Sequence, residues 1–339
     1  MSIFRYVPPH LLGGRAHVIV DGAPRRGTVS TLSHWPHTPT PPGLRADLSA
    51  EIARRAMARS DLLPADVEVA SVDHFDVDGA VALALLVVDG LDAEHGPLLV
   101  EAARVGDFDI VTDRRAALIA FALNGLAAAA PESAVRASTP SGSCDPLERC
   151  AVLTGEALRI VSDLAADPER FESLWGAEWD AYDASARALE EGWVTIEEFL
   201  ENDLAVVRVD SSHLGAARAA WESAPLHPAA VHSVTPCLRV VTLAGDAMAF
   251  HYRYESWVRL ASRRPRRRVD LERLAHDLTA VEGAAGRWVF DGAGSITGGL
   301  HLVGDAASTI EPGRFLESVR GELATLDGGP AAWDPYEPD

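Results

Sequence analysis

The sequence predicts an α/β fold with two domains and a helical connector. Over residues 16–130, short apolar runs alternate with helical segments, a pattern typical of strand–helix units. The stretch 131–146 (PESAVRASTPSGSCDP) is rich in Ser, Pro and Gly, and it separates this half from a strongly helical stretch. A length of 339 residues suits two domains of roughly 100 to 200 residues each. We expect a parallel-sheet α/β domain at 1–146, a helical connector at 147–203 and a smaller α/β or α+β domain at 204–339.

Local patterns place the first elements. A buried strand is expected at 16–20 (AHVIV), followed by a proline-rich ordered loop or linker at 30–42. A helix follows at about 49–59, which Asp47 or Ser49 can cap. The apolar segment 67–72 (VEVASV) predicts an interior parallel strand.

Further helices and a second set of strands complete the expected architecture. Helices are predicted at 80–88, 98–104 and 114–130. The short apolar pair Ile110-Val111 between the last two is consistent with continued strand–helix alternation. After the helical stretch, strands are predicted at 204–209, 237–243 and 249–260. The last two should form a hairpin that turns at Ala244-Gly245-Asp246.

Composition excludes several classes of function. The 30 basic and 50 acidic residues give a net charge of −20, which repels long nucleic acid duplexes and anionic membranes. There is no lysine, which excludes Schiff-base chemistry, pyridoxal phosphate enzymes and a Walker-type phosphate loop. The three cysteines include no CxxC pair, and no signal-like or 18-residue apolar run occurs. We therefore expect a cytoplasmic protein that does not enter a membrane.

The segment His74-Phe-Asp76-Val-Asp78-Gly79 is the strongest candidate for chemistry. It lies between a predicted strand and a predicted helix, where α/β sheets bind ligands. His74, Asp76 and Asp78 form a plausible half-shell for Mn²⁺ or Mg²⁺. The competing interpretation is ordinary turn chemistry, with Asp76 capping the next helix.

The order strand, H-x-D-x-D-G, apolar helix resembles the first motif of the DHH phosphoesterase superfamily. Near the carboxyl end, Gly298-Gly299-Leu300-His301, Gly304 and the helical segment 310–323 resemble the glycine-rich segment and closing helix of that family's substrate domain. The sequence also has departures: no DHH triplet occurs, and 210–213 (DSSH) is only a weak echo of it. The segments SHWP and HFDxDG also suggest a narrower group of uncharacterised bacterial proteins.

The resemblance implies two hard cations that activate a water molecule and stabilise phosphoryl oxygens. His74, Asp76 and Asp78 would be metal ligands and catalytic residues, and Asp107 or Asp109 would bridge the cations. Gly298, Gly299 and His301 would bind substrate. Because the triplet is missing, a mononuclear or inactive site stays open.

Two further segments have both a functional and a structural interpretation. In Ser33-His34-Trp35-Pro36-His37, His34 can complete the metal shell; alternatively, Trp35 is a packing anchor and the histidines are solvated. The cluster Arg263, Arg264, Arg266, Arg267 and Arg268 can grip phosphate, or it is a solvated charge run.

The sequence thus favours a metal-dependent phosphoesterase acting on a small phosphorylated or short oligonucleotide substrate. One alternative is a non-catalytic binding or scaffold protein that keeps the fold without a complete metal site. Another is a mononuclear metal hydrolase with a non-phosphate substrate. The oligomeric state stays open.

Overall fold

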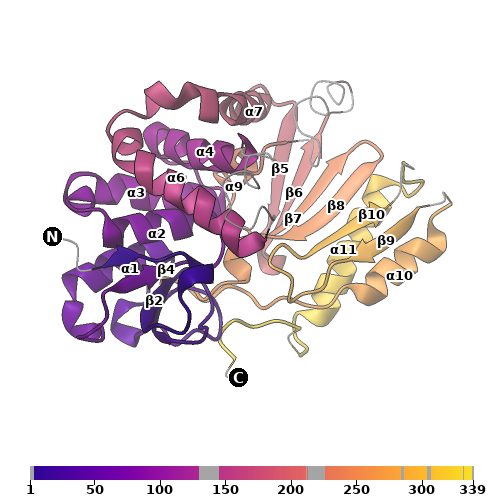
Figure 1. Ribbon diagram of the computed structural model, residues 1–339. Coiled ribbons are helices and arrows are strands. Elements are labelled where there is room, and N and C mark those ends of the chain that lie inside the picture. The colour runs from indigo at the N-terminus through magenta and orange to yellow at the C-terminus, as the bar shows by residue number, and fades with distance from the viewer. Residues whose placement is uncertain are drawn as a thin grey trace. The chain divides into compact units, whose positions relative to one another are not determined.

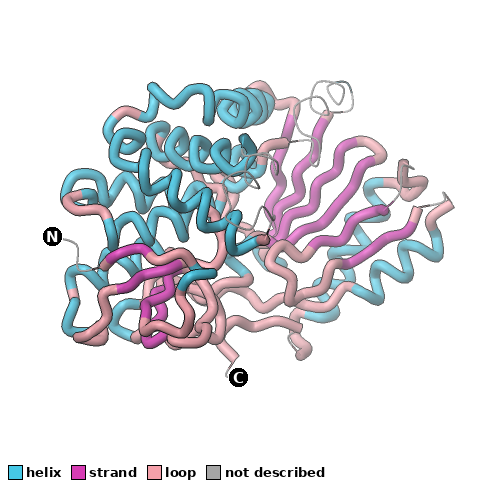
Figure 2. Tube along the Cα trace, viewed as in Figure 1, coloured by secondary structure: helices cyan, strands magenta, loops and turns pink. Residues whose placement is uncertain are grey.

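The computed structural model describes residues 4–129, 145–210, 212, 226–283, 286–303, 307–330 and 332–337. The chain forms two compact units, Met1–Asp180 with Leu260–Arg263, and Ala181–Arg259 with Arg264–Asp339. The predicted α/β class is confirmed, with a parallel sheet in the first unit and a mixed sheet in the second (Figures 1 and 2). The expected linker at 131–146 falls outside the described residues, apart from its last two positions.

The first unit is built on a four-stranded parallel sheet in the order β1-β4-β2-β3. Its strands are β1 (Arg5–Tyr6), β2 (His17–Val20), β3 (Thr28–Leu32) and β4 (Val69–Ser71). The interior parallel strand predicted at 67–72 is confirmed as β4. The loop predicted to begin at Ser30 was wrong at its start, because Ser30 to Leu32 pair with β2. In a parallel sheet the carboxyl ends of all strands lie at one edge.

The helices of the first unit pack on this sheet and on one another (Figure 1). They are α1 (Ser49–Ala58), α2 (Val77–Val87), α3 (Leu91–Phe108), α4 (Arg114–Ala129), α6 (Pro146–Ala166) and the first part of α7 (Glu172–Glu190). Nearly all of α2 is buried, because it contacts β1, β2 and β4 as well as α1, α3 and α6. The strand-like interpretation of Ile110-Val111 was wrong: the pair lies in the short loop between α3 and α4. The segment 147–203 is not a separate connector, since α6 packs on α2, α3 and α4 and since 194–199 is a strand of the second unit.

Asp47 ties the returning segment 260–263 into the first unit. Its carboxylate accepts the backbone N–H groups of Ala261 and Ser262 at 2.7 and 2.8 Å, and also the Ser262 hydroxyl. Neither Asp47 nor Ser49 provides a side-chain cap for α1, whose N-cap residue is Leu48. The predicted capping role of these two residues was therefore wrong.

The second unit contains a six-stranded sheet in the order β5-β6-β7-β8-β10-β9. Its strands are β5 (Val194–Phe199), β6 (Leu204–Val209), β7 (Arg239–Ala244), β8 (Ala247–Tyr252), β9 (Arg287–Phe290) and β10 (Gly299–Val303). The larger hydrophobic core joins one face of the sheet to α10 (Glu272–Val281) and α11 (Pro312–Leu326), and α9 (Pro228–His232) contributes to a smaller core. The predicted hairpin is confirmed as β7–β8, which turns at Gly245 with a φ of 65°. The strand predicted at 249–260 was too long, because β8 ends at Tyr252 and a 3-10 turn follows at Tyr254–Ser256.

No helix in the described part of the chain is both long enough and apolar enough to cross a membrane.

Two glycines on helices of the first unit provide a matched test of this packing. A Cβ at Gly125 of α4 would overlap the backbone carbonyl of Leu174 in α7, whereas a Cβ at Gly155 of α6 would meet nothing within 4 Å. We expect Gly125→Ala to destabilise the protein by about 1–3 kcal/mol through overpacking. Gly155→Ala should stabilise it by about 0.5–1 kcal/mol, because alanine loses less backbone entropy. Urea denaturation measures both, and equal effects of the two changes would contradict the close approach of α4 to α7.

Candidate metal centre

Acidic and imidazole side chains converge at the carboxyl edge of the parallel sheet. Asp21 directly follows β2, His34 follows β3 by one intervening residue, and His74 follows β4 by two. Asp76 and Asp78 lie at the start of α2, just after His74. The parallel topology therefore brings residues that are distant in sequence to one place.

The inner half of the cluster is fully buried. The Nε2 atom of His34 lies 3.5 Å from Asp21 Oδ1, 3.9 Å from Asp78 Oδ2 and 3.4 Å from Asp107 Oδ2. The side chains of His34, Asp21 and Asp78 have no exposed surface, and that of Asp107 is 5% exposed. These four residues therefore surround one enclosed position.

The outer half is partly open to solvent. His74 Nε2 lies 2.8 Å from Asp76 Oδ2 and 3.5 Å from Asp21 Oδ2. The side chains of His74 and Asp76 are 33% and 37% exposed. Asp21 thus presents one oxygen to the inner position and the other to the outer one.

Asp21 has an uncommon backbone conformation. Its φ of 43° lies in the left-handed region, where non-glycine residues are uncommon and often functional. The Ser49 hydroxyl donates to Asp21 Oδ1 at 2.7 Å, which fixes the direction of the carboxylate.

The N-terminus of α1 holds Asp78. The backbone N–H groups of Ser49 and Ala50 donate to the two oxygens of Asp78, each at 2.7 Å. These N–H groups have no partner within the helix, and the helix dipole also favours a negative charge at this end. The role that the sequence suggested for Asp47 or Ser49 is thus taken by a side chain from α2.

His34 and Asp76 are fixed by backbone groups. His34 Nδ1 donates to the Asp47 carbonyl at 2.6 Å, so a neutral ring carries its lone pair on Nε2, the atom that faces the carboxylates. Asp76 Oδ1 accepts the N–H of Gly79 at 2.8 Å, which makes Asp76 the N-cap of α2. The predicted capping role of Asp76 is confirmed, while its other oxygen faces His74.

Close helix packing brings Asp107 into the cluster. At Gly106, a Cβ would overlap the side chain of Val77 in the first turn of α2, so α3 approaches α2 closely there. The next residue, Asp107, faces His34. The alternative residue Asp109 ends α3 in a left-handed conformation with a φ of 55°.

Burial and mutual repulsion perturb the pKa values of the carboxylates. Burial raises the pKa of Asp107 well above its usual range, and the charges of Asp78, Asp76 and Asp21 add to this effect. Burial and the charge of Asp21 likewise raise the pKa of Asp78, which the α1 N–H groups offset only in part. Burial also raises the pKa of Asp76.

The surroundings of Asp21 and His74 favour the charged form of each side chain. Burial alone would raise the pKa of Asp21, but the neighbouring imidazoles, chiefly His74, and the Ser49 hydroxyl lower it to about 2. Burial alone would lower the pKa of His74, but Asp76, Asp21 and Asp73 raise it far above its usual range.

The donor set is suited to a divalent cation. Asp21 Oδ2 and Asp107 Oδ2 are buried, and neither accepts a hydrogen bond within the described residues. Such oxygens are costly unless a proton or a cation compensates them. Two triads, Asp21–His74–Asp76 and Asp21–His34–Asp78, each place their donor atoms within 4.8 Å of one another. Carboxylate and imidazole donors without thiolate suit Mn²⁺, Mg²⁺ or Zn²⁺.

Sequence reasoning found only part of this cluster. The structure divides the predicted half-shell: His74 and Asp76 lie in one triad and Asp78 in the other, and Asp21 belongs to both. His34 is buried, so its interpretation as a solvated loop residue was wrong, whereas His37 is exposed. Asp21 was missed; its signal was an Asp-Gly pair directly after the predicted strand 16–20.

The predicted substrate residues lie in the second unit. Gly299 and His301 belong to β10, and Gly298 directly precedes that strand. Asp291 accepts the Gly299 N–H at 3.2 Å, and its carboxylate lies 3.6 Å from His301 Nδ1. Two residues of the segments that resemble the family's motifs lie outside the described residues: Gly304 of the glycine-rich segment and His213 of 210–213.

The arginine cluster binds the carboxyl-terminal segment. Arg264 pairs with Asp334 at 2.6 Å, Arg266 pairs with Asp327 at 3.1 Å, and Arg267 lies 3.5 Å from the Gly329 carbonyl. Arg263 belongs to the 260–263 segment of the first unit.

Arg268 is fully buried and cannot be a phosphate ligand as predicted. Its guanidinium donates to the Ser256 hydroxyl and to four backbone carbonyls, those of Arg253, Ala293, Ser295 and Ile296. These contacts use all five of its N–H donors.

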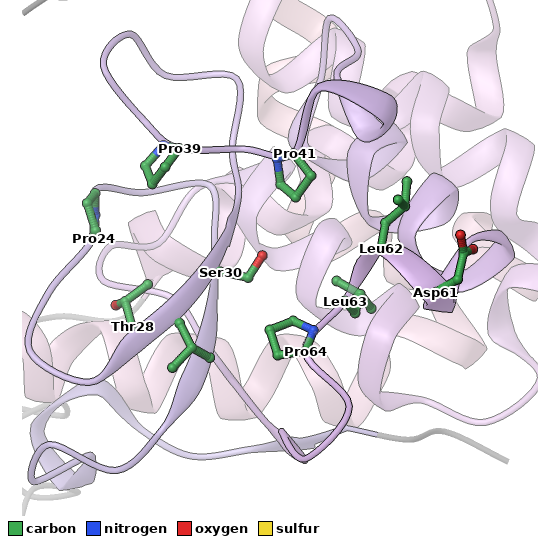
Figure 3. Close-up of a pocket in the computed structure, with 10 residues that line it drawn as sticks. Pro24, Thr28, Ser30, Pro39, Pro41, Asp61, Leu62, Leu63 and Pro64 are labelled. Carbon is green, nitrogen blue, oxygen red and sulfur yellow. The ribbon is translucent and has the colours of Figure 1, made fainter.

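A separate cavity of about 360 Å³ lies beside β3 (Figure 3). Pro24, Pro39, Pro41 and Pro64 line it together with Leu62, Leu63 and polar groups such as Ser30. None of the residues that line this cavity belongs to the acidic cluster.

We expect the cation-free protein to lose stability as the pH rises from about 5 to 8. Asp78 and Asp107 have folded pKa values above the unfolded value near 4, so above that pH the folded state binds more protons than the unfolded state. His74 contributes with the same sign, because its folded pKa is also raised. Urea midpoints in the presence of a chelator measure this dependence. Asp107→Asn should flatten it, while the exposed control Asp66→Asn should not; stability that increases with pH would contradict the assignment.

Comparison with known proteins shows the family but no function. Neither the curated proteins nor the solved structures yield a match. Residues 2–321 match a family of unknown function, DUF6687, over a range that includes every residue of the acidic cluster. The chain belongs to the DUF6687 family.

Proposed function

We propose that this protein is a cytoplasmic, divalent-cation-dependent phosphoesterase that acts on a small phosphorylated or short oligonucleotide substrate. The observation that supports the proposal is the buried cluster in which Asp21 is shared between two triads. The resemblance of its H-x-D-x-D-G segment to the DHH phosphoesterases favours phosphoester chemistry over other metal-assisted hydrolysis.

The residues of the chain would divide the work between two positions. Asp21, His34, Asp78 and Asp107 would hold an inner cation, and Asp21, His74 and Asp76 would hold an outer one. Two divalent cations bound together supply Lewis-acid stabilisation of phosphoryl oxygens and lower the pKa of water. The chain itself fixes these donors through α1, Gly79 and the Asp47 carbonyl, so little reorganisation accompanies binding.

The charge of the protein favours a small substrate. With a net charge of −20, to which the four carboxylates of the cluster contribute, the chain repels extended polyanions. Substrate would approach on the side of His74 and Asp76, whose side chains are partly exposed. Arg264, Arg266 and Arg267 belong to the second unit, and phosphate binding by these three arginines is a separate proposal from the acidic cluster.

A metal titration tests the cation-binding part. A ligand that binds only the folded state at a hundredfold excess over Kd stabilises it by about 2.7 kcal/mol. We expect Mn²⁺ to raise the Tm of the chelator-treated protein by a few degrees. Asp107→Asn should reduce this rise, whereas Asp66→Asn should not. Asp107 is a better site for the test than Asp76 or Asp78, because both of those also accept backbone hydrogen bonds.

An activity assay tests the chemical part. We expect hydrolysis of bis(p-nitrophenyl) phosphate and of a short oligonucleotide to depend on Mn²⁺ or Mg²⁺. Asp21→Asn should lower the rate at least a hundredfold, since its carboxylate is shared by both positions, and Asp66→Asn should leave the rate unchanged. Metal uptake without hydrolysis of either substrate would count against a phosphoesterase.

The second candidate is a non-catalytic protein in which the cluster is a structural polar core. It is favoured by the hydrogen bonds that Asp76 and Asp78 make at the starts of α2 and α1. This function requires an unchanged Tm with Mn²⁺, Mg²⁺ and Zn²⁺, together with marked destabilisation by Asp78→Ala.

A further inference from the structure

We infer that Asp73 is a positioning residue that orients His74 toward the outer cation, and that Gly22 leaves the room Asp73 needs. The inference rests on the cation-binding part of the proposed function. It adds two residues, neither of which is a ligand in that proposal.

The two nitrogens of His74 have different surroundings. Nδ1 lies 3.0 Å from Asp73 Oδ1, while Nε2 lies 2.8 Å from Asp76 Oδ2 and 3.5 Å from Asp21 Oδ2. Once a cation replaced the Nε2 proton, an Nδ1–H that donates to Asp73 would leave the lone pair of the ring on Nε2, the atom that faces the other carboxylates. A carboxylate behind a ligating imidazole fixes its tautomer and orientation in many metal sites.

The contacts of Asp73 point to this role rather than to a local structural one. In the described part of the chain, the hydrogen bond to His74 is the only one that the Asp73 carboxylate makes. The N-cap of α2 is Asp76, so Asp73 does not begin the helix. The His74 imidazole also contacts Trp35, with ring centroids 5.2 Å apart.

Gly22 provides the space in which the Asp73 carboxylate lies. A Cβ at position 22 would lie 2.7 Å from Asp73 Oδ1 and 3.1 Å from Oδ2. Gly22 is not among the glycines with positive φ, so side-chain room rather than backbone conformation explains glycine here. Asp21 thus supplies the carboxylate that both triads share, and Gly22, the next residue, leaves room for the Asp73 carboxylate that orients His74.

A double-mutant cycle on Mn²⁺ affinity tests the inference. With the full-length protein, we expect Asp73→Ala to weaken Mn²⁺ binding by about 10–100-fold, as is typical for a lost outer-shell partner of a metal-ligating histidine. Gly22→Ala should also weaken it, because the carboxylate is displaced but not removed. Asp73→Asn, which keeps a carbonyl acceptor for Nδ1–H, should lose less affinity than Asp73→Ala. The exposed control Asp66→Ala removes the same charge and should leave the affinity unchanged.

The cycle separates positioning from a general structural effect. If Asp73 acts through His74, adding Asp73→Ala to His74→Ala should weaken Mn²⁺ binding no further. Additive losses in the double variant, or an Asp73→Ala affinity within twofold of wild type, would overturn the inference while leaving the proposed function in place. A wild-type protein that binds no Mn²⁺ would overturn both.

Discussion

The gathering of four carboxylates in one place, with those of Asp21, Asp78 and Asp107 buried, is the constraint on which the first unit depends. Unpaired buried charges cost several kcal/mol each, so the fold has to surround them with compensating groups. Part of that compensation comes from the two imidazoles and from the N–H groups at the N-terminus of α1. Another part is protonation, which the raised pKa values of Asp78 and Asp107 favour. Two buried oxygens that accept no hydrogen bond within the described residues remain, and they are the ones that a cation would satisfy.

The surrounding elements are arranged to meet this constraint. β2, β3 and β4 each deliver at least one side chain at the same sheet edge, because all of them are parallel. α1 points its N-terminus at Asp78, and the absence of a side chain at Gly106 lets α3 bring Asp107 close. The cluster is therefore a product of topology and close helix packing rather than of one local motif.

Local sequence was enough to predict part of this arrangement. The apolar segment 67–72 and the apolar run after Gly79 are regular patterns, so β4, α2 and the position of Asp76 and Asp78 could be anticipated. Asp21 could not be distinguished from a turn residue, because its role depends on the parallel pairing of β2 with β3 and β4. The burial of Arg268 could not be predicted for a similar reason. In the sequence Arg268 is the last residue of a run of arginines, and the carbonyls that accept from it include those of Ala293 and Ile296, which are far from it in the sequence.

The contacts of Asp47 limit how this protein can be divided into fragments. Its backbone carbonyl holds the His34 ring, while its carboxylate holds residues 261 and 262, more than two hundred positions later in the chain. A fragment that ends at residue 180 would contain every member of the acidic cluster. It would lack residues 261 and 262, which bind the carboxylate of Asp47, the residue whose carbonyl holds His34. Neither unit is a continuous stretch of the chain, because residues 260–263 of the first unit lie between two parts of the second. A fragment that ends at residue 180 lacks these four residues, and a fragment that begins at residue 181 carries them away from the first unit.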